Sequence, residues 1–216
     1  MLCSPVKPTM DGGLPWRSPT GPQGRPSRPS PDQHRAQPRL LRRPPVRLAL
    51  PDADRRQRLL PEFFALFTRA FLRHHQSYTT AGDVVAAALW APPGGVPVGG
   101  EDAEELGRRI KELAGPDAPR FLGVNKLFDD HHPHGSYWYL QFLGVEPAWQ
   151  GQGIGSALMA PVLARCDREG ARAYLDAASE RNKRLYERHG FQAEDPFAPP
   201  GGPPLWPMWR QPATDR

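Results

Sequence analysis

The hydrophobic positions of this chain follow helix and strand periods only from about residue 46 onward. Large apolar residues recur every three or four positions over 61–73, which predicts an amphipathic helix with Pro61 in its first turn. Two short apolar runs, 77–80 and 84–91, flank Gly82-Asp83 and predict a β-hairpin. Helical patterns return at 101–114 and 119–130.

The clearest strand of the sequence is 137–145, and alternation places Tyr137, Tyr139, Gln141 and Leu143 on one of its faces. A glycine-rich segment follows, and it consists of Gln150, Gly151, Gln152, Gly153, Ile154, Gly155 and Ser156. Apolar residues spaced by four then predict a helix that ends near Gly170, and 172–176 predicts the next strand. The order is therefore strand, glycine-rich loop, helix, strand.

Three glycines in five residues leave backbone N–H groups uncovered at the positive end of the helix, which favours binding of a diphosphate. The dinucleotide fingerprint G-x-G-x-x-G is one alternative, with Gly151 and Gly153 in its first two places and Asp176 as its acidic residue. Ser156 stands where the third glycine of the fingerprint belongs. In addition, five residues separate the strand from the glycines, whereas in the dinucleotide-binding fold the strand leads directly into the glycine-rich loop. A nucleotide-dependent oxidoreductase is thus the weaker alternative.

Another pattern fits better: Gln or Arg, two residues, Gly, one residue, then Gly or Ala, matched by Gln150, Gly153 and Gly155. A second motif lies at 182–191, where a short helix bears Asn and Tyr and closes on Gly-Phe. On these motifs, residues 50–212 resemble the Gcn5-related N-acetyltransferase (GNAT) superfamily. Within it, Pro161 and the ending 204–210 make the chain similar to puromycin N-acetyltransferase and related small-molecule enzymes.

The resemblance implies an α/β fold with a mixed, mostly antiparallel sheet, splayed at the acetyl-CoA site and flanked by helices. It implies acetyl-CoA as co-substrate and an amine of a small molecule as acceptor. The residues expected to hold the cofactor are Leu143, Gly144, Val145, Gln150, Gly151, Gln152, Gly153, Ile154, Gly155, Ser156, Asn182 and Tyr186. A backbone bulge at Leu143-Gly144 is the expected cause of the splay.

A neutral amine can attack the thioester directly, so no protein nucleophile is needed, and Cys166 is expected to be a core residue. Tyr186 is the expected proton donor to the leaving thiolate. Relatives often carry a carboxylate on the central strand, but this sequence has Tyr139 there. Either Tyr139 and Gln141 order a water that removes the amine proton, or a carboxylate from 101–130 does so. We expect no metal site, and interpret His131, His132 and His134 as loop residues.

Residues 1–45 form a separate region in composition, and we expect it to be disordered. The first 47 residues carry 11 prolines and nine Lys or Arg against two Asp, so the basic balance of the chain belongs there and nucleic-acid binding by the folded part is not expected. The acetyltransferase domain is predicted at 46–212. Only 46–50 could form the first strand of the family, and no segment could form its first helix. We therefore hypothesise an upstream start or frame error.

No apolar run approaches the ~20 residues that span a bilayer, and the N-terminus lacks the apolar core of a signal peptide. The two cysteines suggest no disulfide framework, so a cytoplasmic location is the expectation. We expect a monomer or homodimer without membrane partners. The alternative function is a catalytically weak or inactive GNAT-fold protein that senses acyl-CoA.

Overall fold

One sheet organises the chain, and its strands follow the order β1-β2-β3-β4-β5-β7-β6 in a computed structural model. The structure describes residues 16–17, 44–72, 74, 76–81, 84–94 and 101–213. The strands are β1 Trp16–Arg17, β2 Ser77–Thr80, β3 Ala86–Ala91, β4 Trp138–Val145, β5 Ala173–Ala177, β6 Gln192–Ala193 and β7 Trp206–Arg210. The helices are α1 Pro44–Ala49, α2 Ala53–Leu72, α3 Glu101–Ala114, α4 Ala118–His131, α5 Ile154–Glu169 and α6 Glu180–Glu187.

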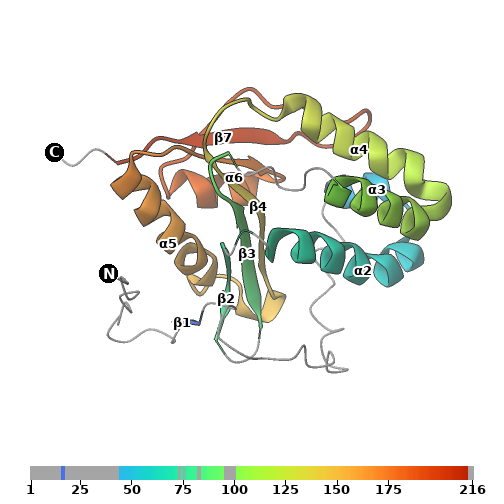
Figure 1. Ribbon diagram of the computed structural model, residues 1–216, viewed down its shortest axis with the longest axis horizontal. Helices are drawn as coiled ribbons and strands as arrows, with labels where there is room; N and C mark the ends of the chain where they lie inside the picture. Colours follow the sequence, from blue (N-terminus) through green and yellow to red (C-terminus); the bar gives the residue numbers. More distant parts are fainter. Residues whose placement is uncertain are drawn as a thin grey trace.

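The strand pairings confirm the expected mixed sheet. Neighbouring strands pair antiparallel except β4 and β5, which are parallel and are connected through α5. A parallel pair requires such a crossover. Figure 1 shows α5 on one side of the sheet and α2, α3 and α4 on the other.

The face under α5 holds the main hydrophobic core. Leu158, Val162 and Cys166 of α5 are buried together with Trp138 of β4 and Leu175 of β5. The spacing of four residues along α5 gives the helix one apolar stripe, and this stripe is what the sheet covers. Cys166 is therefore a core residue, as expected.

The opposite face carries aromatic side chains. Tyr137, Tyr139 and Tyr174 are buried there, and Trp209 of β7 and Phe142 of β4 pack against the same cluster. Helix α2 reaches this cluster through Phe71, while Phe63 of α2 stacks on Phe121 of α4 at 4.5 Å between ring centroids. The helices α1 to α4 thus form a layer with a small core of its own.

A bulge in β4 changes which residues of this strand contribute to each set of side chains. The register with β3 runs regularly from Val145 to Phe142, but Trp90 then pairs with Leu140, so Gln141 is an extra residue without a cross-strand partner. The bulge was expected at Leu143-Gly144, and that prediction is wrong, because both residues pair in regular register. The extra residue also reverses the alternation, so Leu143 lies on the α5 face and not with Tyr137 and Tyr139.

Strands β4 and β5 part soon after they meet. Their pairing is limited to Trp138 with Ala173 and Tyr139 with Tyr174, although β4 continues to Val145 and β5 to Ala177. The sheet therefore opens between its two central strands, as the family resemblance implied.

Two expectations at the front of the domain are corrected. Residues 46–50 do not form a strand, because Leu50 N donates to Val46 O at 2.9 Å within and just after helix α1. Helix α2 begins at Ala53, where the Asp52 carboxylate accepts from Arg55 N at 2.7 Å, so Pro61 lies inside the helix and not in its first turn. The predicted disorder of residues 1–45 concerns residues that lie mostly outside the described ones. Among those that are described, the short strand β1 pairs with β2.

Arg210 connects three segments of the chain at the end of the sheet where β4 and β5 are paired. Its Nη2 donates to Asp167 Oδ2 at 2.8 Å and its Nε donates to His189 O at 2.9 Å. Asp167 Oδ1 also accepts from Ala213 N at 2.7 Å. The Arg210 guanidinium is the main reason why the pKa of Asp167 lies below its ordinary value.

We predict that Asp167→Asn lowers the free energy of unfolding by about 1–2 kcal/mol at neutral pH, because it removes a charge-assisted hydrogen bond at a partly buried site. The folded pKa of Asp167 is depressed, so the advantage of the wild type should shrink as pH falls below the ordinary range of aspartate. Urea unfolding of both proteins across pH measures this. Glu169→Gln, in an exposed pair with Arg165, is the control and should have little effect.

Candidate active site

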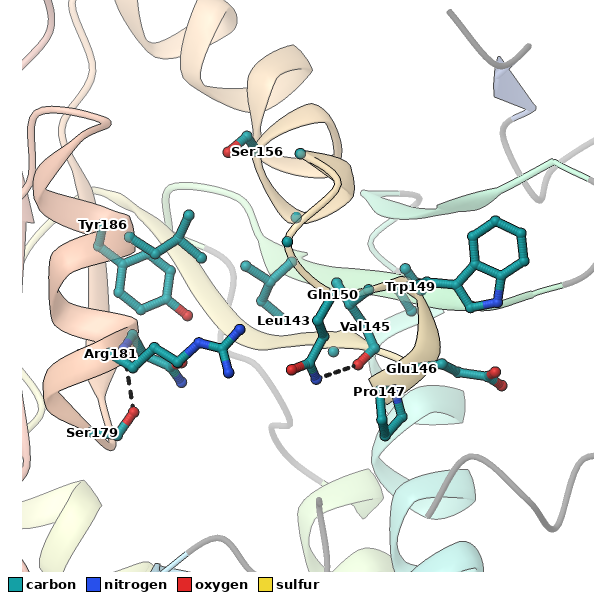
Figure 2. Close-up of a pocket in the computed structure, with 18 of the residues that line it drawn as sticks. Leu143, Val145, Glu146, Pro147, Trp149, Gln150, Ser156, Ser179, Arg181 and Tyr186 are labelled. Carbon is teal, nitrogen blue, oxygen red and sulfur yellow. Dashed lines mark hydrogen bonds between the residues drawn. The ribbon is translucent and has the colours of Figure 1, made fainter. Parts of the chain in front are cut away.

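A cleft of about 1160 Å³ opens where β4 parts from β5. Its walls are the end of β4, the glycine-rich loop, the first turn of α5, helix α6 and residues 84–87 before and within β3. Figure 2 shows Leu143, Val145 and Gln150 at the centre of this cleft, Tyr186 on one side and Trp149 on the other. Chain segments that are far apart in sequence thus meet around one space.

The glycine-rich loop has a backbone that other residues rarely adopt. Gly151 has φ +82° and Gly153 has φ +78°, both in the left-handed region. Gly153 is the N-cap of α5, and no side chain caps that helix end. The first N–H groups of a 16-residue helix therefore face the loop without a protein side chain in front of them, which suits an anion.

Gln150 connects the loop to the parted edge of β4. Glu146 N donates to Val85 O of the neighbouring chain segment at 2.8 Å, so alternation directs the backbone groups of Val145 away from β3 and toward the parting. Gln150 Nε2 donates to Val145 O at 2.9 Å, as Figure 2 shows. The side chain thus satisfies a carbonyl that a regular sheet would have paired with β5.

Helix α6 forms the other wall. Ser179 caps it, because its Oγ accepts from Asn182 N at 3.2 Å. Tyr186, one turn after Asn182, is 6% exposed, and Figure 2 shows its ring directed toward the cleft. His189 Nε2 lies 2.8 Å from Ser156 Oγ, at hydrogen-bonding distance, so the end of α6 is tied to the first turn of α5.

Most residues expected to bind the cofactor line this one cleft. They are Leu143, Gly144, Val145, Gln150, Gly151, Gly153, Gly155, Ser156, Asn182 and Tyr186. Gln152 and Ile154 do not line it: the Gln152 amide donates back to Ala148 O at 3.3 Å, and Ile154 packs against the main core. Their expected contact with the cofactor is limited to backbone groups, and the binding role of the whole set stays a prediction.

Three arginines of the cleft were missed from the sequence. Arg181, Arg184 and Arg188 all line it, and Figure 2 shows the guanidinium of Arg181 pointing inward. Their spacing of three and four residues on a helix that carries Asn182 and Tyr186 was the available signal. They add positive charge opposite the open end of α5.

Tyr139 and Gln141 lie apart from the cleft lining. Tyr139 is 7% exposed on the aromatic face, where His132 lies edge-on to its ring at 4.5 Å between centroids. Burial raises the pKa of Tyr139 well above its ordinary value, so the phenol keeps its proton and cannot itself accept one. Gln141 is the bulged residue of β4.

The expectation that the histidines near the start of β4 are solvated loop residues is confirmed for His134, which is exposed in a loop, but not for His131 and His132. His131 ends α4 and stacks on Phe197 at 4.1 Å, and His132 is half-buried among tyrosines, where burial lowers its pKa. Within the part of the chain that the structure describes, no three His, Cys, Asp or Glu side chains are grouped to hold a metal ion. Burial raises the pKa of Cys166 to about 11, so its thiol is unsuited to nucleophilic attack.

Comparison with known proteins decides the family. The model of the acetyltransferase (GNAT) family matches residues 61–191, more than half of the chain. The chain belongs to the GNAT family. The match includes both strands that part, the glycine-rich loop and helix α6.

Two individual relatives agree with this assignment. An uncharacterized N-acetyltransferase of Schizosaccharomyces pombe is 32% identical over 127 residues, which are 51% of this chain and 48% of that protein. The chain therefore matches about half the length of this relative. A solved structure from Corynebacterium glutamicum, described as histone acetyltransferase HPA2 and related acetyltransferase, has a TM-score of 0.51 at 25% identity and covers 85% of this chain and 88% of its own. The similarity to puromycin N-acetyltransferase stays a prediction.

No described helix has both the length and the apolar character needed to cross a membrane.

We predict that Gly153→Ala weakens the glycine-rich loop through backbone strain alone. A Cβ at Gly153 would meet no atom within 4 Å, but φ +78° costs an L-residue about 1–2 kcal/mol. Gly144→Ala is the matched control, since its Cβ also meets open space and its φ is ordinary. Thermal unfolding should therefore show a loss for Gly153→Ala only. Equal losses in both variants would contradict the assignment of strain to the loop.

Proposed function

We propose that this protein transfers the acetyl group of acetyl-CoA to an amine of a small molecule by direct attack. The observation that carries the proposal is the parting of β4 from β5 directly beside an uncapped, glycine-punctuated helix start. The first feature offers backbone hydrogen bonds to an extended amide chain, and the second offers N–H groups to a diphosphate. Coenzyme A contains both groups in one molecule.

The cleft suggests how the co-substrate would lie. The diphosphate fits the N–H groups from Gln152 to Ser156, with the arginines of α6 opposite. The pantetheine arm fits the parted edge of β4, where it would add like a short strand beside Val145. This placement directs the thioester toward Tyr186 and Leu143.

The reaction needs few protein groups. The amine nitrogen forms a bond with the thioester carbonyl carbon and loses a proton, the carbon–sulfur bond breaks, and the thiolate takes a proton. When the amine and the thioester are held in a near-attack arrangement, the reaction needs no covalent enzyme intermediate. Tyr186 is the proposed proton donor to sulfur, since its ring borders the cleft from α6.

The first test separates an enzyme from a sensor. Calorimetry with acetyl-CoA and with a nicotinamide dinucleotide should show binding of the former only. Release of free thiol is then followed with protonated and neutral amines: a diamine, an arylalkylamine, an aminonucleoside and a lysine peptide. Turnover of a small amine supports the proposal, and preference for the peptide would contradict the acceptor class. Binding without any turnover would favour an acyl-CoA sensor, and no binding would refute both.

We predict that Tyr186→Phe lowers kcat about 10- to 100-fold and leaves the affinity for coenzyme A nearly unchanged. The phenylalanine keeps the packing of the buried ring on Phe191 and removes only the hydroxyl. Steady-state kinetics and calorimetry on the same protein measure the two effects. Tyr78→Phe, which removes a hydroxyl outside the cleft lining, should change neither. Unchanged turnover in Tyr186→Phe would exclude the acid role.

A further inference from the structure

A carboxylate lies beside the opening of the sheet, on the face opposite α5. Asp176 is on β5, two residues beyond the last residue that pairs with β4. Its neighbours Leu175 and Ala177 point into the α5 core, so alternation directs Asp176 to the aromatic face together with Tyr174. The side chain is half-buried at the point where the central strands separate.

The carboxylate is held in position by one hydrogen bond. Tyr174 Oη donates to Asp176 Oδ1 at 2.7 Å. This bond restrains Oδ1 of the carboxylate on the side of Tyr174. The second oxygen, Oδ2, is the atom to which a proton can be added while the Tyr174 bond is kept.

We infer that Asp176 is the general base that removes a proton from the protonated acceptor amine, an inference that rests on the proposed function. The proton passes from the ammonium nitrogen to Oδ2, which leaves a neutral amine and a carboxylic acid. The nitrogen lone pair then attacks the thioester carbonyl, and Asp176 later returns its proton to water. No oxidant or further reactant is required.

Several of the carboxylates that the sequence offered are engaged elsewhere, whereas Asp129, near the end of α4, is exposed but lies close to His132 and Tyr139. Within 101–130, Asp117 pairs with Arg55 at 3.0 Å and Asp130 pairs with Lys126 at 2.6 Å. Glu112 of α3 pairs with Arg108 on the exposed side of that helix. Asp176 instead stands on the strand that borders the opening.

The surroundings of Asp176 suit a base that works near neutral pH. Burial raises its pKa to about 6, against the Tyr174 hydrogen bond and the charge of His131, which lower it. Tyr139 of β4 and Tyr137, just before β4, face the same carboxylate. Both phenols have raised pKa values, so they stay protonated. Asp176 is thus ionised at neutral pH but more basic than an exposed aspartate.

A second cavity lies close to this carboxylate and is lined by residues that contact Asp176, although Asp176 itself does not line it. Its volume is about 750 Å³, and its lining includes Tyr174 and Pro207, the hydrogen-bond donor and the cross-strand partner of Asp176. Trp206 adds an aromatic wall, and Glu194 and Asp195 outnumber the single Lys183 there. These residues favour a compact cationic amine with an apolar or aromatic body.

The test compares two acceptors that differ in charge. Benzylamine is protonated at neutral pH and must lose a proton before attack, whereas aniline is already neutral. Asp176→Asn keeps an oxygen that can accept from Tyr174. In the full-length protein with acetyl-CoA, it should lower kcat/KM for benzylamine by about 10²- to 10⁴-fold and change that for aniline little. Asp130→Asn, an exposed carboxylate, is the matched control and should leave both unchanged.

The pH dependence supplies a second readout. In the wild type, kcat/KM for benzylamine should fall as pH drops through about 6, because protonated Asp176 can accept no proton. Asp176→Glu should keep part of the activity and the acidic limb, and Asp176→Asn should lose the limb. His132→Asn tests another nearby base, whose ring lies 5.5 Å from that of Tyr174. Loss of the limb in His132→Asn alone would overturn the inference.

The remaining outcomes are distinct. Equal losses for benzylamine and aniline in Asp176→Asn would indicate a structural role and overturn the inference. Benzylamine turnover at the wild-type rate in this variant, with coenzyme A still bound, would overturn it and leave the proposed function intact. A wild-type protein that binds no coenzyme A, or binds it without acetylating any amine, would overturn the proposed function and this inference together.

Discussion

The parting of two central strands is the constraint on which the rest of the structure depends. Backbone groups in the middle of a sheet are normally paired, and leaving them unpaired away from water is costly. Here β4 and β5 stop pairing after Tyr139 and Tyr174, so the remaining length of β4 needs other partners. Gln150 supplies one by donating to Val145 O, and the core between α5 and the sheet keeps both strands in place. The opened part of β4 lies beside the glycine-rich loop, and both line the same cleft.

The bulge at Gln141 reverses the alternation of side chains along β4, so that residues of odd number change face. Before it, Tyr137 and Tyr139 point to the aromatic face; after it, Leu143 and Val145 belong to the α5 side. One strand can therefore contribute to the cleft on one face and to an aromatic layer on the other. The proposed co-substrate would approach from α5 and α6, and the proposed acceptor from the side of Asp176. Such an arrangement lets the two reactants meet at the parting without competing for the same space.

Local patterns predicted much of this fold, because helix and strand periods and glycine positions are local properties. The helix α3, the strand β4 and the loop from Gln150 were expected close to where they lie, and helix α6 was expected from the family motif at 182–191. The bulge was predicted at the wrong residues because the alternation of side chains along one strand does not show which residue is extra. Gln141 is recognised as the extra residue only from the pairing of β4 with β3. The segment at 46–50 forms a helix because its apolar residues pack on α2 to α4, a contact that no local pattern records. Asp176 was visible only as an acidic residue at the end of a predicted strand, since its bond to Tyr174 is seen only in the structure.

The position of Asp176 also sets a balance between stability and chemistry. Its folded pKa of about 6 lies above the ordinary value of 3.8, so folding favours the protonated form. A carboxyl whose pKa is raised on folding contributes most to stability below its unfolded pKa, and this contribution is lost as pH rises through the folded pKa. A tenfold difference in proton affinity between the folded and unfolded states is worth about 1.4 kcal/mol, so the destabilisation at neutral pH is on the order of 3 kcal/mol. A half-buried residue with only a structural role would gain nothing from that penalty. For a residue that must take a proton from an amine, the same burial raises the basicity on which the reaction depends.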